Sequence, residues 1–206
     1  MSRARLENLD RDRQLRLFES AAEEFGSHGY DAASLNRILD QSGMSKSSLY
    51  YYFDDKADLF TTMMERAIGF LMRELGGFDP LSLTADTYWS ELESVYRRSI
   101  EVVNRNAWYV KLGRMFYRLR GDRRASAQIG HVYQAAQSWM ERTIVHGQKL
   151  GVVRTDLPNS MLIDAAMGLG EALDHWMVEH WDEMSAAERF DMVGVQIALL
   201  HRLLAA

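Results

Sequence analysis

Apolar side chains recur at every third or fourth position along almost the whole chain, and this spacing constrains the fold more than any other feature of the sequence. A 3.6-residue repeat places apolar residues on one stripe of an amphipathic helix. An early stripe of this kind consists of Leu15, Phe18, Ala22 and Phe25. Only two prolines interrupt the 206 residues, and no stretch of useful length alternates between polar and apolar residues as a strand does. We therefore predict an all-α protein.

Start and stop signals place three short helices near the amino end. Gly26 and Gly29 are expected to end the first helix. Ser34 and Ser45 are expected to be the N-caps of the next two, because serine side chains accept hydrogen bonds from the first free amides of a helix. A turn at Ser42-Gly43 separates these two helices.

These signals predict a small three-helix domain at residues 1–55 and a larger helical body at residues 56–206. The fourth helix is expected to begin among the acids of residues 54–58, because negative charge is favoured at a helix N-terminus. Residues 78–84 are the best candidate for a linker. Further helices are expected at residues 84–104, 106–120, 124–150, 159–181 and 186–205.

The composition excludes several classes of protein. The chain contains no cysteine, which rules out disulfides and thiolate metal sites. No apolar run approaches the roughly 20 residues of a membrane helix, and the polar N-terminus lacks the apolar region of a secretory signal. We therefore expect a cytoplasmic protein. The net charge of −5 argues against a basic coat over the whole molecule but leaves local basic patches open.

The third predicted helix carries an unusual polar face. Helical geometry puts Leu49 and Phe53 on one side of residues 45–53, with Tyr52 beside them as a packing residue. The opposite side gathers hydroxyls and aromatic rings, and lysines stand at the start of the helix and just beyond its end. The residues of this face are Lys46, Ser47, Ser48, Tyr50, Tyr51 and Lys56.

No acid occurs from Gly43 to Phe53. Hydroxyls and ammonium groups bind phosphate oxygens, and short polar side chains at the start of a helix can reach base edges in a major groove. Together with the preceding helix and the turn, this segment is expected to form a helix-turn-helix whose second helix reads DNA. The alternative, that the tyrosines only fill a core, is less favourable for Tyr50 and Tyr51, because exposed aromatic pairs usually have a partner.

A longer pattern runs through the same region. Its members, in register, are Ser34-Leu35, Ile38, Gly43-Met44-Ser45, Ser48-Leu49-Tyr50, Tyr52-Phe53, Lys56 and Leu59. In spacing and residue type this stretch resembles the DNA-binding module of the tetracycline-repressor (TetR) family of bacterial transcriptional regulators. The resemblance covers about the first 60 residues. Asn36, where arginine is frequent, and Ser47, where glycine is common, depart from the family pattern and make the operator sequence unsafe to infer.

The resemblance implies roles for the matching positions. Backbone phosphates would be held by Ser34, Tyr50, Tyr51 and Lys56, and the residues nearest to base edges would be Lys46, Ser47 and Ser48. Ser45 completes the predicted DNA-binding set. The arginines of the first segment form a local basic excess, which is either an arm that reaches DNA or a solvated tail. They are Arg3, Arg5, Arg11, Arg13 and Arg16.

The resemblance also implies a homodimer, because two-fold symmetry doubles the contacts of a single reading helix. We expect the last two helices to form the interface, as a four-helix bundle with the partner. The predicted interface residues are Ala165, Leu169, Leu173, Val193, Ile197, Leu200 and Leu204. The alternative is that these residues form only the core of a single chain.

A cavity for a small-molecule effector is implied within the helical body. Aromatic side chains line apolar pockets well, although they also fill cores. The predicted pocket residues are Phe70, Trp89, Tyr96, Trp108, Phe116, Tyr117, Trp139 and Trp176. An apolar or aromatic effector is therefore expected.

These inferences predict a ligand-responsive repressor that binds a palindromic operator as a dimer, needs no cofactor and is not an enzyme. The alternative is a helical-bundle, metal-dependent enzyme. Its ligands would be Glu171, His175 and Glu179, which share one helix face at i, i+4 and i+8. A third possibility is a module that binds only other proteins.

Overall fold

The computed structural model describes residue 6 and residues 9–106, 108–119 and 123–206, without the side chains of residues 123–129, 131 and 132. Within these ranges the regular elements are helices, and the only strand-like pairing is an isolated bridge between Val153 and Ala205. The all-α prediction is confirmed. None of the helices in the described ranges is long and apolar enough to cross a membrane.

The chain divides into two compact units. The first unit contains the described residues of Met1–Phe70 and Ala107–Gly130, and the second contains those of Leu71–Asn106 and His131–Ala206. The two units therefore alternate along the sequence. The domain boundary predicted between residues 55 and 56 stays a prediction.

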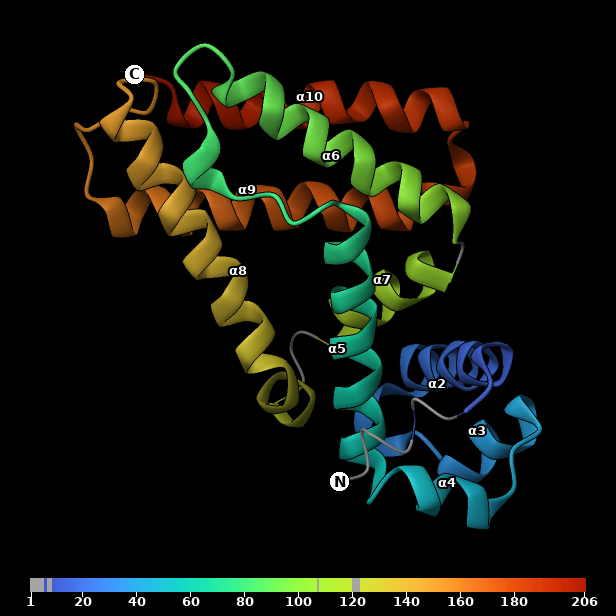
Figure 1. Ribbon diagram of the computed structural model, residues 1–206. Helices are drawn as coiled ribbons and strands as arrows, with labels where there is room; N and C mark the ends of the chain where they lie inside the picture. The colour runs from blue at the N-terminus through green and yellow to red at the C-terminus, as the bar shows by residue number, and fades with distance from the viewer. Residues whose placement is uncertain (1–5, 7–8, 107, 120–122) are drawn as a thin grey trace. The chain divides into compact units, whose positions relative to one another are not determined.

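The first unit is built around α2. Its elements are α2 (Arg11–Ala32), α3 (Leu35–Ser42), α4 (Lys46–Tyr52), most of α5 (Lys56–Glu74), α7 (Trp108–Leu119) and the start of α8 (Arg123–Lys149). Figure 1 shows α3 and α4 next to one another beneath α2. On its other side, α2 packs along α7, where an NH1 group of Arg118 donates to the carbonyl of Gly26.

The two predicted N-cap residues determine where the short helices begin. Ser34 caps α3 by accepting a hydrogen bond from the amide of Arg37, and Ser45 caps α4 by accepting one from the amide of Ser48. Gly43 ends α3 at a φ of 67°, a left-handed conformation that glycine adopts without strain. The helix-turn-helix predicted from these residues is confirmed as a fold.

Two details of the first helix were predicted wrongly. Gly26 does not end it, because α2 continues to Ala32 and departs from helical geometry only at Gly29, where φ is 77°. Leu15 is 39% exposed and does not belong to the buried stripe. The other predicted members, Phe18, Ala22 and Phe25, are buried, and Leu17 is buried with them.

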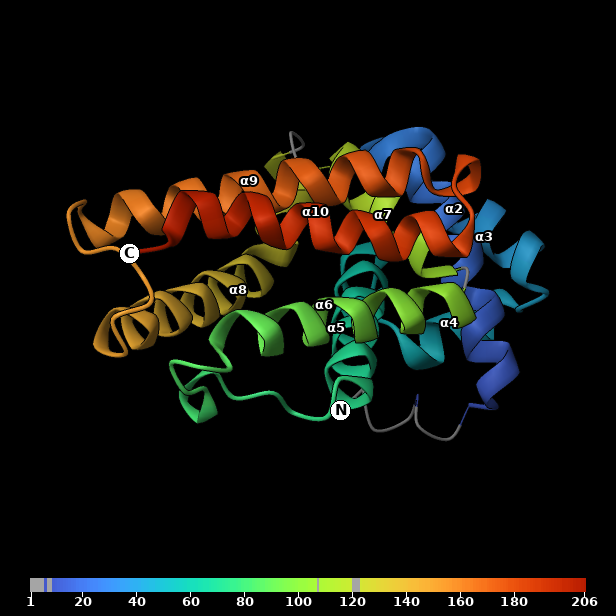
Figure 2. The same cartoon turned by 90° about the horizontal axis from the view of Figure 1, so that it is seen from above.

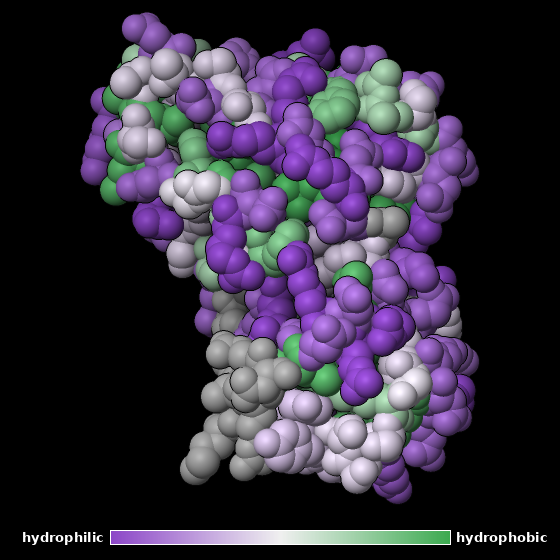
Figure 3. Space-filling view, turned by 45° about the vertical axis from the view of Figure 1, so that its right-hand side comes forward, coloured by the Kyte–Doolittle hydropathy of each residue, from purple (hydrophilic) through white to green (hydrophobic). Residues whose placement is uncertain are grey.

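The second unit contains η1 (Pro80–Ser82), α6 (Tyr88–Arg105), the remainder of α8, α9 (Asn159–Glu179), η2 (Trp181–Glu183) and α10 (Ala186–Leu204). The helix α10 packs against both α6 and α9, and Figure 2 shows α9 and α10 running side by side. In the space-filling view of Figure 3, hydrophilic residues predominate and hydrophobic ones appear in separate patches. The apolar stripes of the helices are thus mostly turned inward, as their spacing predicts.

The segment predicted as a linker is packed against α8. Leu83 is buried, and its carbonyl oxygen lies 2.9 Å from Nε2 of His146. Nearby, the buried hydroxyl of Tyr88 donates to the carbonyl of Thr143 at 2.9 Å. Gly147 allows this close approach, because a Cβ there would lie 2.7 Å from the Tyr88 hydroxyl oxygen.

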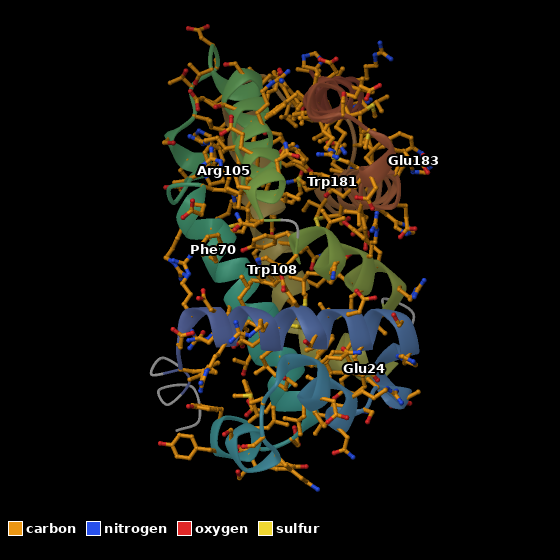
Figure 4. The ribbon with its side chains drawn as sticks, turned by 90° about the vertical axis from the view of Figure 1, so that its right-hand side faces the viewer. Glu24, Phe70, Arg105, Trp108, Trp181 and Glu183 are labelled. Atoms are coloured by element: carbon orange, nitrogen blue, oxygen red, sulfur yellow. The ribbon has the colours of Figure 1, made fainter. Side chains whose placement is uncertain are left out.

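A buried carboxylate joins α2 to α3. Glu24 is only 2% exposed, and its oxygens accept hydrogen bonds from Nε of Arg37 at 2.9 Å and from the amide of Ser34 at 2.8 Å. A terminal nitrogen of Arg37 also donates to the carbonyl of Ala32. The hydrogen-bonded Arg37 guanidinium holds the pKa of Glu24 below its ordinary value, despite the opposing effect of burial. Figure 4 labels Glu24 on α2.

We predict that Glu24→Gln lowers the free energy of unfolding at neutral pH by about 2 kcal/mol, because it removes hydrogen bonds to a charged acceptor. A carboxyl whose pKa is lowered by folding stabilises the protein above its unfolded pKa, and this stability disappears as the pH falls through the folded pKa. The difference in the free energy of unfolding between wild type and variant should therefore decrease when the pH falls below 4.5, the ordinary pKa of a glutamate. Urea unfolding at several pH values measures it.

Glu23→Gln provides a matched control. Glu23 is half exposed and lies 3.5 Å from Lys111, so this exposed pair should contribute less than about 1 kcal/mol. Equal effects of the two substitutions would contradict the role assigned to Glu24.

Candidate functional site

The outer face of α4 is open to solvent. Tyr50 and Tyr51 are 51% and 55% exposed, and Lys46 and Ser47 are also exposed. Leu49 and Phe53, on the opposite side of the helix, are buried at 1% and 2%. The division of this helix into an inner apolar side and an outer polar side was predicted from the spacing of its residues.

The serines at the start of α4 form a small hydrogen-bonded group. The hydroxyl of Ser45 accepts from the amide of Ser48 at 3.2 Å and donates to the hydroxyl of Ser48 at 2.9 Å. It also lies 3.1 Å from the hydroxyl of Ser47. Ser45 therefore positions the first turn, whereas Ser47 presents its side chain outward. Ser48 is partly covered.

The aromatic rings at the end of α4 are held against one another. The rings of Tyr51 and Tyr52 meet edge to face, with centroids 5.0 Å apart. Tyr52 is half-buried, as expected for a packing residue. This contact supports the outward orientation of Tyr51.

Ser34 and Lys56, both predicted to hold phosphates, have internal roles. Ser34 caps α3 with its hydroxyl and donates its amide to Glu24. Lys56 Nζ donates to the carbonyls of Asp31 at 2.9 Å and Ala33 at 3.2 Å, and it lies 5.1 Å from the centre of the Tyr30 ring. Lys56 thus links the start of α5 to the end of α2. An ammonium group has three donors, and these carbonyls accept two of them.

Neither this internal role of Lys56 nor the pair formed by Glu24 and Arg37 was predicted from the sequence. A signal for Glu24 was present, since it follows Leu17 and Ala21 at i+7 and i+3 on the buried stripe. A carboxylate in such a position requires a partner. Of the basic N-terminal residues, Arg3 and Arg5 lie outside the described residues, whereas Arg11 and Arg13 fall in the first turn of α2.

The predicted pocket residues are distributed over both units. In the first unit, Phe70 and Trp108 both contact the buried Tyr109, at centroid distances of 6.1 Å and 4.5 Å (Figure 4). Phe116 and Tyr117 contact one another in α7.

The other four predicted pocket residues lie at separate places in the second unit. Trp89 contacts His201, Trp139 contacts Phe78, and Trp176 is 44% exposed and stacked on His180. Tyr96 lies near Gly170 of α9. Two surface hollows of this unit are lined by other residues, one where residues 151–156 meet the C-terminal residues and one on α6. The position of an effector pocket stays a prediction.

The predicted interface residues fall into two sets. The four of α10 are core residues of the single chain, because Val193, Ile197, Leu200 and Leu204 are each at most 8% exposed. Their part in a dimer interface stays a prediction. In α9, Ala165 is exposed, and Leu169 and Leu173 are partly exposed.

A second stripe of α9 is open to solvent. Small and apolar side chains follow one another there at i, i+4, i+7, i+11 and i+15. The residues of this α9 stripe are Met161, Ala165, Gly168, Ala172 and Trp176. Val195 and Ala198 of α10 are also exposed.

The metal-site alternative has no support in the described part of the chain, where no group of three or more histidine, aspartate or glutamate residues could hold a metal ion. His175 Nε2 and a carboxylate oxygen of Glu179 are 4.0 Å apart, and both side chains are about half exposed.

Comparison with known proteins identifies the N-terminal part of the first unit. The family model described as "Bacterial regulatory proteins, tetR family" matches residues 17–63, which span α3, α4 and the start of α5. Residues 17–63 therefore form a segment of the TetR family. The matched segment contains the helix-turn-helix that carries the exposed face of α4.

Two curated relatives match part of the chain. The chain is 38% identical over 61 residues to the HTH-type transcriptional activator FasR of Mycolicibacterium smegmatis, covering 29% of this chain and 28% of FasR. It is 35% identical over 51 residues to the HTH-type transcriptional repressor SCO4008 of Streptomyces coelicolor, covering 25% and 27%. The chain thus matches little more than a quarter of each relative's length.

The fold of the whole chain is similar to that of SmeT, the repressor of the Stenotrophomonas maltophilia multidrug efflux pump SmeDEF. Its complex with triclosan aligns with a TM-score of 0.72 over 96% of this chain and 93% of SmeT. The identity is 18%, so the similarity concerns the fold.

We predict that Lys56→Met destabilises the protein by about 1 kcal/mol, because the Asp31 and Ala33 carbonyls lose a charged donor while the apolar stem of the side chain is kept. Urea unfolding measures the loss. Lys46→Met removes an exposed lysine of α4 and should leave the unfolding midpoint nearly unchanged. If the two substitutions had equal effects on stability, the internal role of Lys56 would be wrong.

Proposed function

We propose that this TetR-family chain is a ligand-responsive repressor that binds a palindromic operator as a homodimer. The observation that carries the proposal is the solvent-exposed face of α4, which presents Lys46, Ser47, Tyr50 and Tyr51. These hydroxyl and ammonium groups suit phosphates and base edges, and the buried side of the helix anchors them to a folded unit.

We propose different roles for different members of the predicted DNA-binding set. Ser34 and Ser45 are caps, and we propose that they act mainly by setting the start of α3 and α4. Lys56 would offer its remaining N–H group to a phosphate while it holds the end of α2. The groups proposed to meet the DNA first are therefore those of the outer face of α4.

The dimer interface is proposed on the α9 stripe, from Met161 to Trp176, together with Val195 and Ala198 of α10. Small residues allow helices to approach closely, and exposed apolar side chains gain most from being covered. The proposed interface leaves out the predicted α10 residues, because each is at most 8% exposed in the single chain.

Release from DNA is proposed to follow binding of a small apolar or aromatic molecule in the helical body. SmeT, which shares the fold, has been solved in complex with triclosan. An effector shifts the equilibrium only if it binds the DNA-free state more tightly. The repressor sense remains part of the proposal, because one of the curated relatives is an activator and the other a repressor.

A gel-shift titration with the DNA upstream of the protein's own gene tests the DNA-binding face. Lys46→Ala should weaken binding and reduce the slope of log affinity against log salt by about one, because one fewer counterion is released. Lys149→Ala, an exposed lysine of the second unit, is the matched control and should leave the slope unchanged. An unaltered slope in Lys46→Ala would remove this lysine from the interface.

Analytical ultracentrifugation tests the dimer face. Ala172→Glu places a charge in the middle of the α9 stripe and should weaken dimerisation at least about tenfold, since leaving a charge desolvated in an interface costs several kcal/mol. Ala135→Glu adds the same charge at an exposed position of α8 and is the control. A dimer of undiminished affinity in Ala172→Glu would place the interface elsewhere.

A further inference from the structure

A polar cluster lies within the helical core of the second unit. Tyr96 comes from α6, Glu171 and Asp174 come from α9, and Gln196 comes from α10. Gln196 is only 2% exposed, although its neighbours Val193, Ile197 and Leu200 are apolar core residues. Polar side chains in such a place are costly unless they are hydrogen-bonded.

Asp174 is the centre of this cluster. The Gln196 side-chain amide donates to its Oδ1 over a long 3.5 Å, and the Tyr96 hydroxyl is a second hydrogen-bond partner. Part of the Asp174 residue remains exposed, whereas its carboxyl group is surrounded by protein atoms. Burial of this carboxyl raises its pKa to about 6, the negative charge of Glu171 adds to the rise, and the hydrogen bonds from Gln196 and Tyr96 oppose it.

Only one end of the Gln196 side-chain amide forms a hydrogen bond. Its Nε2 donates to Asp174, but its Oε1 is buried and accepts no hydrogen bond from the described residues. A buried acceptor without a donor costs about 1–3 kcal/mol. A neutral carboxylic acid that faces a primary amide has the complementary arrangement, because one oxygen accepts from the amide nitrogen and the hydroxyl donates to the amide oxygen.

We propose that Asp174 is a proton-operated latch between α9 and α10. In its neutral form the carboxylic acid donates to Oε1 of Gln196 while it accepts from Nε2, which closes a two-way pair between the helices. When the proton leaves, Oε1 loses its donor and a negative charge remains in the core. Acidification therefore tightens the α9–α10 pair.

The other charged groups nearby are engaged elsewhere or share the sign of Asp174. On α6, Arg97 donates to Glu93 and to the carbonyl of Phe190. On α9, His175 is half exposed and lies near Glu179. Glu171 carries the same charge as ionised Asp174, so it favours the neutral acid. On α10, Gln196 does not titrate.

The latch lies between the helices that carry the proposed dimer face, but its test does not depend on DNA binding or on dimerisation. Asp174→Asn is the informative substitution, because the asparagine amide can form the same two-way pair with Gln196 and has no proton to lose. Asp191→Asn, at an exposed position of α10, is the matched control.

Urea unfolding of the full-length chain between pH 4.5 and 7.5 is the experiment. A group whose pKa rises from 3.8 to about 6 on folding destabilises the protein progressively as the pH rises through that interval. The unfolding equilibrium constant of the wild type should therefore increase about 25-fold relative to that of Asp174→Asn over this range. Asp191→Asn should follow the wild type. Parallel profiles for the wild type and Asp174→Asn would overturn the proposal.

A second measurement uses the wild-type chain alone and holds even if the variant fails to fold. The side-chain amide signals of Gln196 in an NMR titration should move with a midpoint near pH 6, together with one aspartate carboxyl carbon. Gln196 signals that stay still while that carboxyl titrates would show that the proton is not shared with the amide, and the latch would be rejected.

Discussion

One buried carboxylate determines where the outer face of α4 is presented. Glu24 binds both the Arg37 side chain and the Ser34 amide, so it fixes the direction in which α3 leaves the end of α2. The left-handed Gly43 then turns the chain from α3 into α4. The orientation of α3 and α4 depends on such contacts, because these helices are too short to be stable by themselves.

Much of the helix-turn-helix could be predicted because its signals are local. Ser34, Gly43 and Ser45 act on amides and carbonyls within a few residues, so their roles can be inferred from the sequence. The partners of Glu24 and Lys56 could not be inferred in this way, since they lie 10 to 25 residues away and meet only after folding. Lys56 also shows that a residue matching a family pattern can have a structural role in the free protein.

In the helical body, the spacing of apolar residues predicted the helices, but it did not predict which elements pack against their apolar faces. The apolar stripe of α10 was assigned to a dimer interface, whereas the structure buries it against α6 and α9. Apolar spacing predicts that one face of a helix is covered, but it does not indicate whether the same chain or another chain covers that face. The aromatic residues show the same limit, because rings such as Trp89 and Trp139 contact individual neighbours, and their presence in the sequence does not tell whether they also line a cavity.

The separation of α4 into a buried apolar side and an exposed polar side has an evolutionary consequence. The inward residues of this segment, Leu49 and Phe53, are buried, while Ser47, Tyr50 and Tyr51 are exposed. Substitutions at the outward positions should therefore be tolerated by the scaffold in most combinations. Proteins with this helix can therefore acquire a different DNA specificity in evolution through substitutions that leave the fold stable.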